Sequence, residues 1–375
     1  MMVTALKGLK VIELARILAG PWCGQVLADL GAEVIKIEHP NGDDTRSWGP
    51  PFVERENDHS AAYFHACNRG KQSLSLDLKH TDDLATVKAL IAKADVVIEN
   101  FKVGGLRAYG LDYDSLKSTN PQLIYCSITG FGQTGPMAHL PGYDFMIQGL
   151  SGVMDLTGEP EGQPQKMGVA FADIFTGLYS AIAIQAAVIE RERTGVGANI
   201  DMALFDCMLG VLANQAQNYL ASGKVPKRLG NAHPNIVPYQ VFNASDGAVI
   251  IACGNDRQFA ALAAALDRPE WASQFPTNAS RVESRALLIG LMSPVLANYS
   301  RDSILALCEK AGVPCGPILD VGEALQHPQA THRRMVSKVD GVNILRSPMM
   351  INGVPAVAAT ASPALQKPAK KAQSE

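Results

Sequence analysis

The first 130 residues alternate short apolar runs with segments of helical spacing. The apolar runs lie at residues 10–14, 33–38, 73–78, 95–100 and 123–130, and the helical segments include 19–32 and 82–94. Strands that alternate with helices of this length are typical of βαβ units. The pattern therefore predicts a parallel, doubly wound sheet in this part of the chain.

A long helical segment begins at Asp173 and ends in a charged turn before Gly195. Basic residues followed by glycine are typical of a helix end. Apolar residues occur on most faces of this segment, so we expect it to be largely buried. Another strand is predicted at 198–206, followed by helical spacing up to Gly223.

The pattern changes at residues 223–242, which are loop-rich and locally basic. Two apolar runs then flank Ser245-Asp246-Gly247, which predicts a β-hairpin, and helical spacing continues to Lys310. We therefore expect an α/β fold with a large Rossmann-like domain and a smaller α+β domain joined by long connectors. The predicted ranges are 1–222 with 331–360 returning for the large domain, 223–330 for the small domain, and 361–375 for a disordered tail rich in Pro, Lys and Ala.

Composition limits the possible function. The chain has 375 residues and a formal net charge of −3, which gives no reason to expect nucleic acid or an anionic membrane as a partner. Seven scattered cysteines without a CxxC pair are typical of reduced thiols in the cytoplasm, and neither Cys nor His has metal-site spacing. The spacing of Cys and His gives no reason to expect a bound metal. Charged residues interrupt the apolar N-terminus and prolines interrupt the uncharged segment 347–366, so we expect neither a signal peptide nor a membrane helix, and therefore a soluble protein.

Three common nucleotide and hydrolase motifs are missing from the sequence. There is neither a GxxxxGK[ST] loop nor a GxSxG elbow. The first strand–turn–helix unit has Leu18-Ala19-Gly20-Pro21-Trp22 where a dinucleotide enzyme has GxGxxG, although the second strand does end in Glu38. Without those glycines the backbone cannot approach a pyrophosphate in the usual way, so NAD and FAD are not expected.

Several long motifs resemble class III CoA-transferases, the CaiB/BaiF family. They include GLKVIELARILAGPWCGQVLADLGAEVIKIEHP, ADVVIENFKVGGL, YCSITGFGQTGP, PGYDF, GVAFADIFTGLYSAIAIQAA and AGVPCGPI, and the resemblance covers residues 6–340. The resemblance implies transfer of CoA between carboxylic acids, with a coenzyme A thioester as substrate rather than a permanently bound cofactor. It also implies an interlocked homodimer. The chain departs from the family at its end, where SPALQKPAKKAQSE replaces a segment that usually contains LGEHT.

The resemblance identifies Asp173 as the nucleophile that attacks the acyl-CoA thioester. The residue itself stands directly before the apolar part of the long helix, which predicts an N-cap position. At that position the helix dipole favours the anion, and a nucleophilic carboxylate must be ionised. The alternative is that Asp173 only caps the helix.

The resemblance also implies a set of CoA-binding residues after the first strands of the sheet. They are Ile17, Leu18, Ala19, His39, Lys71, Leu76, Lys79, Asn100, Phe101 and Lys102. This placement agrees with ligand binding at the carboxyl edge of an open α/β sheet. Taken singly, Leu76 and Phe101 are equally compatible with a place in the core. Arg107 is expected to replace an arginine that the family often has nearby.

Substrate contacts are expected from two further segments. Tyr143 and Asp144 belong to PGYDF, where the related α-methylacyl-CoA racemases have a catalytic histidine; a tyrosine is a poor acid/base near neutral pH. The segment RLGNAHPN resembles the succinyl-CoA:dicarboxylate (glutarate-type) branch, so Arg228, His233 and Asn235 are expected to meet a remote carboxylate. A solvated basic loop is the alternative for that segment. For the whole chain, a racemase-type isomerase and a non-catalytic CoA- or nucleotide-binding module are the alternative functions.

Overall fold

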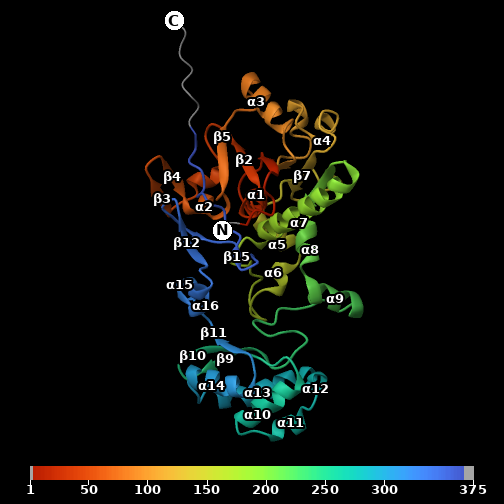
Figure 1. The fold of residues 1–375 in the computed structure, drawn as a ribbon. Coiled ribbons are helices and arrows are strands. Elements are labelled where there is room, and N and C mark those ends of the chain that lie inside the picture. The colour runs from red at the N-terminus through yellow and green to blue at the C-terminus, as the bar shows by residue number, and fades with distance from the viewer. Residues whose placement is uncertain (1–2, 367–375) are drawn as a thin grey trace. The chain divides into compact units, whose positions relative to one another are not determined.

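The computed structural model describes residues 3–366, which form two compact units (Figure 1). One unit comprises residues 3–153, Lys166–Lys224 and 328–366, and the other comprises Met154–Gln165 and Val225–His327. Residues 154–165 therefore belong with the second unit, whereas the sequence analysis placed them in the large domain. Helix α6 (Val153–Leu156) lies at this boundary.

A six-stranded sheet forms the centre of the first unit. Its strands lie in the order β5-β2-β1-β6-β7-β8, and every neighbouring pair is parallel. Their bounds are β1 Lys10–Glu13, β2 Glu33–Glu38, β5 Lys71–Ser75, β6 Val96–Glu99, β7 Ile124–Thr129 and β8 Ala198–Ala203. The predicted parallel, doubly wound sheet is thus confirmed. The last strand ends earlier than predicted because α8 (Leu204–Gly210) begins directly after it.

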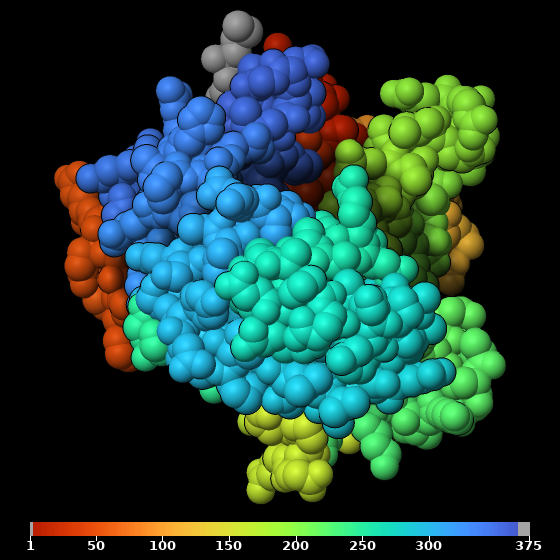
Figure 2. Space-filling view, turned by 90° about the horizontal axis from the view of Figure 1, so that it is seen from below, coloured from red at the N-terminus to blue at the C-terminus, as the bar shows by residue number. Residues whose placement is uncertain are grey.

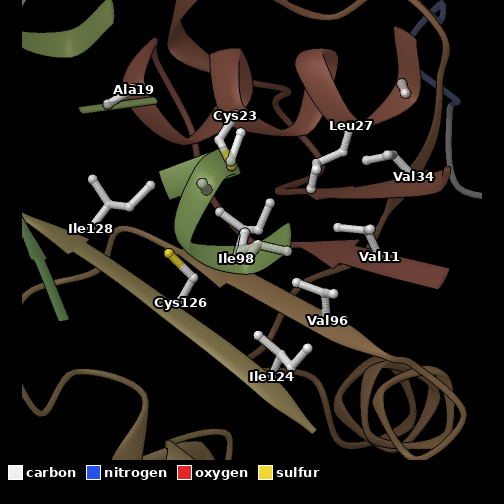
Figure 3. Close-up of a cluster of buried hydrophobic side chains, with 14 of the residues drawn as sticks. Val11, Ala19, Cys23, Leu27, Val34, Val96, Ile98, Ile124, Cys126 and Ile128 are labelled. Carbon is white, nitrogen blue, oxygen red and sulfur yellow. The ribbon is translucent and has the colours of Figure 1, made fainter. Parts of the chain in front are cut away.

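Apolar side chains cover both faces of the sheet. On one face, Val11, Ile98 and Cys126 pack with residues of α1 (Ala19–Asp29) and α7 (Phe171–Thr194), as Figure 3 shows. On the other face, Ile12 and Val97 pack under α3 (Thr81–Ile91) and α4 (Tyr113–Leu116). Burial on both faces explains why the central strands β6 and β7 are mostly apolar.

Helix α7 is less buried than the sequence predicted. It packs along α1 and α8, but Leu178, Ile182 and Ile189 are exposed, Ile182 to 60%. The prediction of a largely buried helix is therefore wrong for the single chain, because only one side of α7 meets the sheet layer. Within residues 3–366, α7 is also the one helix long and apolar enough to span a membrane, a property that core helices share.

The C-terminal part of the chain returns to the first unit. It forms the hairpin β12 (Val336–Val339) and β13 (Val342–Leu345) and the short pair β14 (Met350–Ile351) and β15 (Val354–Pro355). The predicted disordered tail is wrong for residues 361–366: Ala361 and Ser362 are buried, and Arg46 donates to the carbonyl of Pro363. The rest of that predicted tail, 367–375, lies outside the described residues.

The second unit contains a three-stranded antiparallel sheet and a layer of helices. The predicted hairpin is confirmed, since β9 (Tyr239–Ala244) and β10 (Gly247–Ala252) pair in register, and β11 (Cys315–Pro317) joins the other edge of β10. The helices are α10 Asp256–Ala265, α11 Glu270–Gln274, α12 Asn278–Glu283, α13 Arg285–Leu296, α14 Arg301–Ala311 and α15 Val321–Gln326. Figure 2 shows the outer surface of this helical layer in green-blue to blue.

The remaining elements of the first unit are shorter than α1 and α7. They are η1 Asp44–Ser47, β3 Phe52–Arg55, β4 Asp58–Ala61, α2 Ala62–Cys67, η2 Arg107–Tyr109, α5 Asp144–Leu150, α9 Ala213–Ser222 and α16 Pro328–His332.

Candidate active site

Helices α1 and α7 approach each other closely at Gly177. A Cβ atom at this position would lie 2.7 Å from the carbonyl oxygen of Ala19, so only a glycine permits the observed spacing. Asp173 lies one turn earlier on α7, and residues four apart share one face of a helix. The close approach therefore brings the carboxylate of Asp173 to the N-terminal end of α1, at the carboxyl edge of the sheet.

Asp173 is the third residue of α7 rather than its N-cap. The cap position is taken by Ala170, which has no side chain to accept a hydrogen bond. The predicted capping role is therefore wrong. Within residues 3–366, the Asp173 side chain has neither a hydrogen-bond donor nor an ion-pair partner, although it is only half-buried.

Asp144 is an acidic residue bonded to the first turn of α7. The loop that carries it lies against β7, where a Cβ at Gly130 would be 2.5 Å from the Cα of Gly142. Its Oδ1 accepts from the backbone N–H of Ala172 at 2.8 Å, and its Oδ2 accepts from Gln148 Nε2 at 2.7 Å. Asp144 thus tethers α5 to the first turn of α7, beside Asp173.

The surroundings of Asp173 favour its protonated form. Burial raises its pKa to about 7, and the negative charge of Asp144 adds to the rise. Asp173 does lie in the first turn of α7, where the dipole favours an anion, but burial outweighs this. The expectation that the helix dipole keeps Asp173 ionised near neutral pH therefore conflicts with the raised pKa.

A cavity of about 420 Å³ opens in front of Asp173 and is lined by nine of the residues predicted from the sequence. They are Ile17, Leu18, Ala19, Asn100, Phe101, Lys102, Tyr143, Asp144 and Asp173 itself. We call this the Asp173 cavity. The sheet edge thus brings together residues from four separate segments of the chain, as βαβ topology predicts.

Two further cavities lie along the same unit. The His39 cavity, about 360 Å³, is lined by His39, Leu76, Lys79 and Phe101 of the predicted set. A third, about 310 Å³, is lined by Lys102 and Arg107. Phe101 lines both the Asp173 and the His39 cavities, and Lys102 lines both the Asp173 cavity and the third. The three cavities are therefore neighbours around the loop that follows β6.

Lys71 lies in the core rather than at a cavity. Its side chain is fully buried and its Nζ lies 2.8 Å from Glu13 Oε2, with further bonds to Pro21 O and Asn68 Oδ1. It lines none of the three cavities described above. The prediction that Lys71 contacts CoA is therefore wrong, because its ammonium is already satisfied inside the protein.

Asn100 does line the Asp173 cavity, but its side chain is already hydrogen-bonded. Its Oδ1 accepts from the backbone N–H of Arg16 at 3.0 Å, and its Nδ2 donates to the carbonyl of Arg16 at 2.8 Å. The amide therefore fixes the loop between β1 and α1.

Tyr63 is a residue that the sequence analysis missed. Burial raises its pKa to about 12, and the next contribution is the charge of Asp173, which places the phenol near that carboxylate. Tyr63 lies on α2 and packs edge-on against Trp48, with ring centroids 5.3 Å apart. Its motif, AAYFHAC, carries no pattern that distinguishes it from a core aromatic.

The remaining predicted substrate residues lie in the second unit. Arg228 forms an ion pair with Asp155 at 2.8 Å and also donates to its carbonyl. His233 accepts from the N–H of Asn235 at 3.1 Å and lies against the ring of Tyr239. The guanidinium of Arg228 is thus held by its own unit. Among residues 3–366, no group of three His, Cys, Asp or Glu side chains is arranged to hold a metal ion.

Comparisons with known proteins agree with this geometry. Residues 6–369 match the family described as CoA-transferase family III. The chain is 52% identical over 360 residues to "Succinate--glutarate CoA-transferase" of Agrobacterium fabrum, covering 93% of this chain and 90% of that protein. It is 42% identical to "Acetyl-CoA:oxalate CoA-transferase" of Acetobacter aceti, covering 92% and 89%. A crystal structure of a CAIB/BAIF family protein from Brucella suis is 60% identical, with a TM-score of 0.87 and 97% of each chain covered.

Proposed function

Because the chain belongs to CoA-transferase family III and moves CoA from an acyl-CoA to an acceptor acid, we propose that Asp173 is the covalent nucleophile of this transfer. One observation carries the proposal. The Asp173 carboxylate lies at a cavity of about 420 Å³ and, within residues 3–366, has no cationic or hydrogen-bonding partner that would occupy it. A structural aspartate in a protein interior normally has such a partner.

The reaction begins when an oxygen of Asp173 attacks the thioester carbonyl of the donor. The C–S bond breaks, CoA leaves as a thiolate, and a mixed anhydride forms on Asp173. The thiolate then attacks the Asp173 carbonyl carbon, the C–O bond breaks, and the donor acid leaves as a carboxylate. The product of this half-reaction is an aspartyl-CoA thioester.

The second half-reaction repeats these steps in reverse with the acceptor. The acceptor carboxylate attacks the Asp173 thioester, releases the thiolate and forms a new anhydride. The thiolate then attacks the acceptor carbonyl, which yields the new acyl-CoA and frees the Asp173 carboxylate. Both anhydrides are sensitive to water, so the reaction requires that water be excluded from the Asp173 cavity while they exist.

CoA is proposed to lie along the three neighbouring cavities. The exposed cations Lys79, Lys102 and Arg107 would face its phosphates, since each lines a cavity and remains accessible to solvent. The apolar side chains of Leu76 and Phe101 would meet the adenine or pantetheine. His39, Ile17, Leu18 and Ala19 complete this proposed surface.

The substrate pair is proposed to be succinyl-CoA and a short dicarboxylic acid such as glutarate. The support is the 52% identity to a protein named for that pair, although a relative at 42% is named for acetyl-CoA and oxalate. Tyr143 and Asp144 line the Asp173 cavity and are proposed to meet the acid. Arg228, His233 and Asn235 are proposed to meet the remote carboxylate of the acid, and for Arg228 this would require an exchange of Asp155 for the substrate carboxylate.

An interlocked homodimer in the cytoplasm completes the proposal. The exposed apolar side chains of Leu178, Ile182 and Ile189 on α7 would be covered in such a dimer. All seven cysteines lie in the described part of the chain and all are free thiols, which is typical of a reducing compartment.

The test is to trap the acyl group on Asp173. The enzyme is mixed with succinyl-CoA and hydroxylamine, and its peptides are analysed by mass spectrometry. We expect a hydroxamate at Asp173 in the wild type and none in D173N, which keeps the shape of the side chain. CoA transfer without a hydroxamate at this residue would overturn the proposal. Exchange of the α-proton for deuterium without any acceptor acid would instead indicate a racemase.

A further inference from the structure

The backbone of Ile17 adopts a conformation that its side chain disfavours. Its φ is 70°, in the left-handed region, where a β-branched residue is rare because its Cβ crowds the backbone. Such a conformation persists only where neighbouring groups hold it. Ile17 lines the Asp173 cavity, so its conformation shapes the wall that faces the nucleophile.

Two side chains hold the loop that contains Ile17. The backbone N–H of Ile17 donates to both carboxylate oxygens of Asp43, at 3.3 and 3.2 Å. The preceding residue, Arg16, is held by the amide of Asn100 through its N–H and its carbonyl. Consecutive residues of the loop are therefore fixed by side chains that follow β2 and β6.

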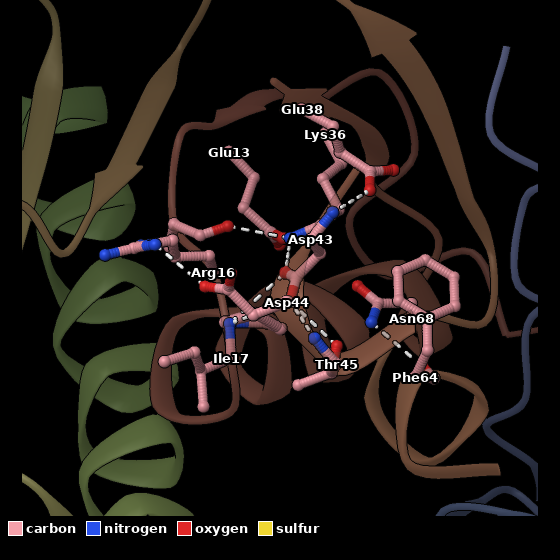
Figure 4. A network of polar contacts seen from close by, with 12 residues as sticks. Glu13, Arg16, Ile17, Lys36, Glu38, Asp43, Asp44, Thr45, Phe64 and Asn68 are labelled. Carbon is pink, nitrogen blue, oxygen red and sulfur yellow. Dashed lines mark hydrogen bonds and ion pairs between the residues drawn. The ribbon is translucent and has the colours of Figure 1, made fainter. Parts of the chain in front are cut away.

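Asp43 is itself held by a buried network, shown in Figure 4. Its Oδ2 lies 2.9 Å from Lys36 Nζ, and its Oδ1 accepts from the N–H and the hydroxyl of Thr45 at 3.0 and 2.7 Å. Lys36 in turn donates to Glu13 at 3.1 Å and to the carbonyl of Ala15 at 2.7 Å. The network therefore joins strands β1 and β2 to the loop at Ile17.

We propose that Asp43 is a positioning residue, which holds Ile17 in the conformation that orients the thioester toward Asp173. Its own side chain lines the His39 cavity, not the Asp173 cavity, so it acts on the reaction through Ile17. This inference rests on the proposed role of Asp173. It adds a second requirement, namely that the loop between β1 and α1 keeps a conformation that isoleucine does not adopt by itself.

The test measures how fast, and to what extent, the hydroxamate adduct forms at Asp173 when the enzyme is mixed with hydroxylamine and saturating succinyl-CoA. In D43A we expect the rate constant to fall by about 100-fold, because a displaced loop misorients the thioester. The matched control is D29A. Asp29 is equally buried and paired with Arg69, but it lines none of the cavities found among residues 3–366. D29A should lower the melting temperature and leave the rate constant unchanged.

A glycine at position 17 separates positioning from general destabilisation. Glycine adopts a positive φ freely, so it needs Asp43 less. In an I17G background, D43A should cost less than about tenfold in the rate constant, a coupling that a purely structural role would not produce. An equal loss in both backgrounds would overturn the inference. If D43A does not fold, N100A should give the same pattern, since Asn100 holds the neighbouring peptide group.

Steady-state CoA transfer by the same variants keeps the two proposals apart. A wild type that transfers CoA without an adduct overturns the role of Asp173. If D43A then still loses transfer activity and I17G reduces that loss, Asp43 holds the loop at Ile17 for the transfer reaction, but orientation of the thioester toward Asp173 is overturned. A D43A variant that forms the adduct at the wild-type rate overturns only the role of Asp43.

Discussion

Asp144 accepts a hydrogen bond from the backbone N–H of Ala172, and its charge thereby lies beside the carboxylate of Asp173. The two acidic side chains come from different segments of the chain and meet at one cavity. Asp144 has donors for both of its oxygens, whereas Asp173 has none within residues 3–366. The pair is therefore unequal: Asp144 is hydrogen-bonded through both oxygens, whereas the pKa of Asp173 is raised to about 7.

The pH dependence of the reaction should report the pKa of Asp173. Only the ionised carboxylate attacks the thioester, and burial together with Asp144 raises its pKa to about 7. We expect kcat/KM to rise from about pH 5.5 to about pH 8 and then to level off. In D144N the rising part of the profile should move to lower pH, because the like charge is removed. Identical profiles for D144N and the wild type would contradict this account of the pair.

The same pKa predicts how D173N affects stability. The pKa of Asp173 is raised from 3.8 to about 7, so the folded protein is destabilised by this group as the pH rises from about 4 to 7. At pH 8 D173N should be more stable than the wild type by on the order of 2 kcal/mol, about half of the full conversion because the side chain is partly exposed. Melting temperatures should show the gain shrinking toward pH 4; a gain independent of pH would contradict the prediction.

Gly177 allows us to test the approach of α7 to α1. An alanine there would place its Cβ 2.7 Å from the Ala19 carbonyl, so G177A should push the helices apart and cost about 1–3 kcal/mol. Adduct formation at Asp173 should slow as well. The control is G210A on α8, where a Cβ would meet nothing within 4 Å. G210A should leave both stability and rate close to the wild type, and equal effects of the two variants would contradict the packing argument.

Substitution of Lys71 and of Lys79 should have different effects, because Lys71 is a buried structural cation and Lys79 is proposed to bind CoA. K71M leaves Glu13 with one fewer partner in the core, so it should cost about 3–5 kcal/mol in chemical unfolding. K79M removes an exposed cation that lines the His39 cavity, so it should raise the KM for acyl-CoA by about tenfold without a change in stability. The reverse pattern would restore Lys71 as a CoA contact.

The sequence predicted the sheet because its central strands β1, β6 and β7 are short apolar or β-branched runs that alternate with helical segments. The family resemblance pointed to Asn100, Phe101 and Lys102, and all three line a cavity, because residues that follow parallel strands meet at one edge. The same reasoning failed for Lys71, which stands at the start of β5 rather than after its end. Residues that follow the carboxyl end of a strand therefore line a cavity, whereas Lys71, at the amino end of its strand, lies in the core.

The protonation of Asp173 could not be predicted from the sequence. Its pKa depends on burial and on Asp144, which lies 29 residues earlier in the chain and approaches only because two glycines, Gly130 and Gly142, allow close contact. The sequence analysis wrongly predicted disorder for residues 361–366 for a similar reason. A segment rich in Pro and Ala is held by partners distant in sequence, among them Arg46, which local composition does not show.

Transfer of oxygen through Asp173 tests the central claim most directly. The acceptor acid is supplied with a heavy oxygen isotope in its carboxylate, and after a single turnover the peptide containing Asp173 is weighed by mass spectrometry. Attack of the acceptor on an aspartyl thioester leaves one acceptor oxygen on Asp173, so we expect the heavy isotope in that peptide. Formation of the new acyl-CoA with an unlabelled Asp173 would show that CoA passes between the acids without this carboxylate.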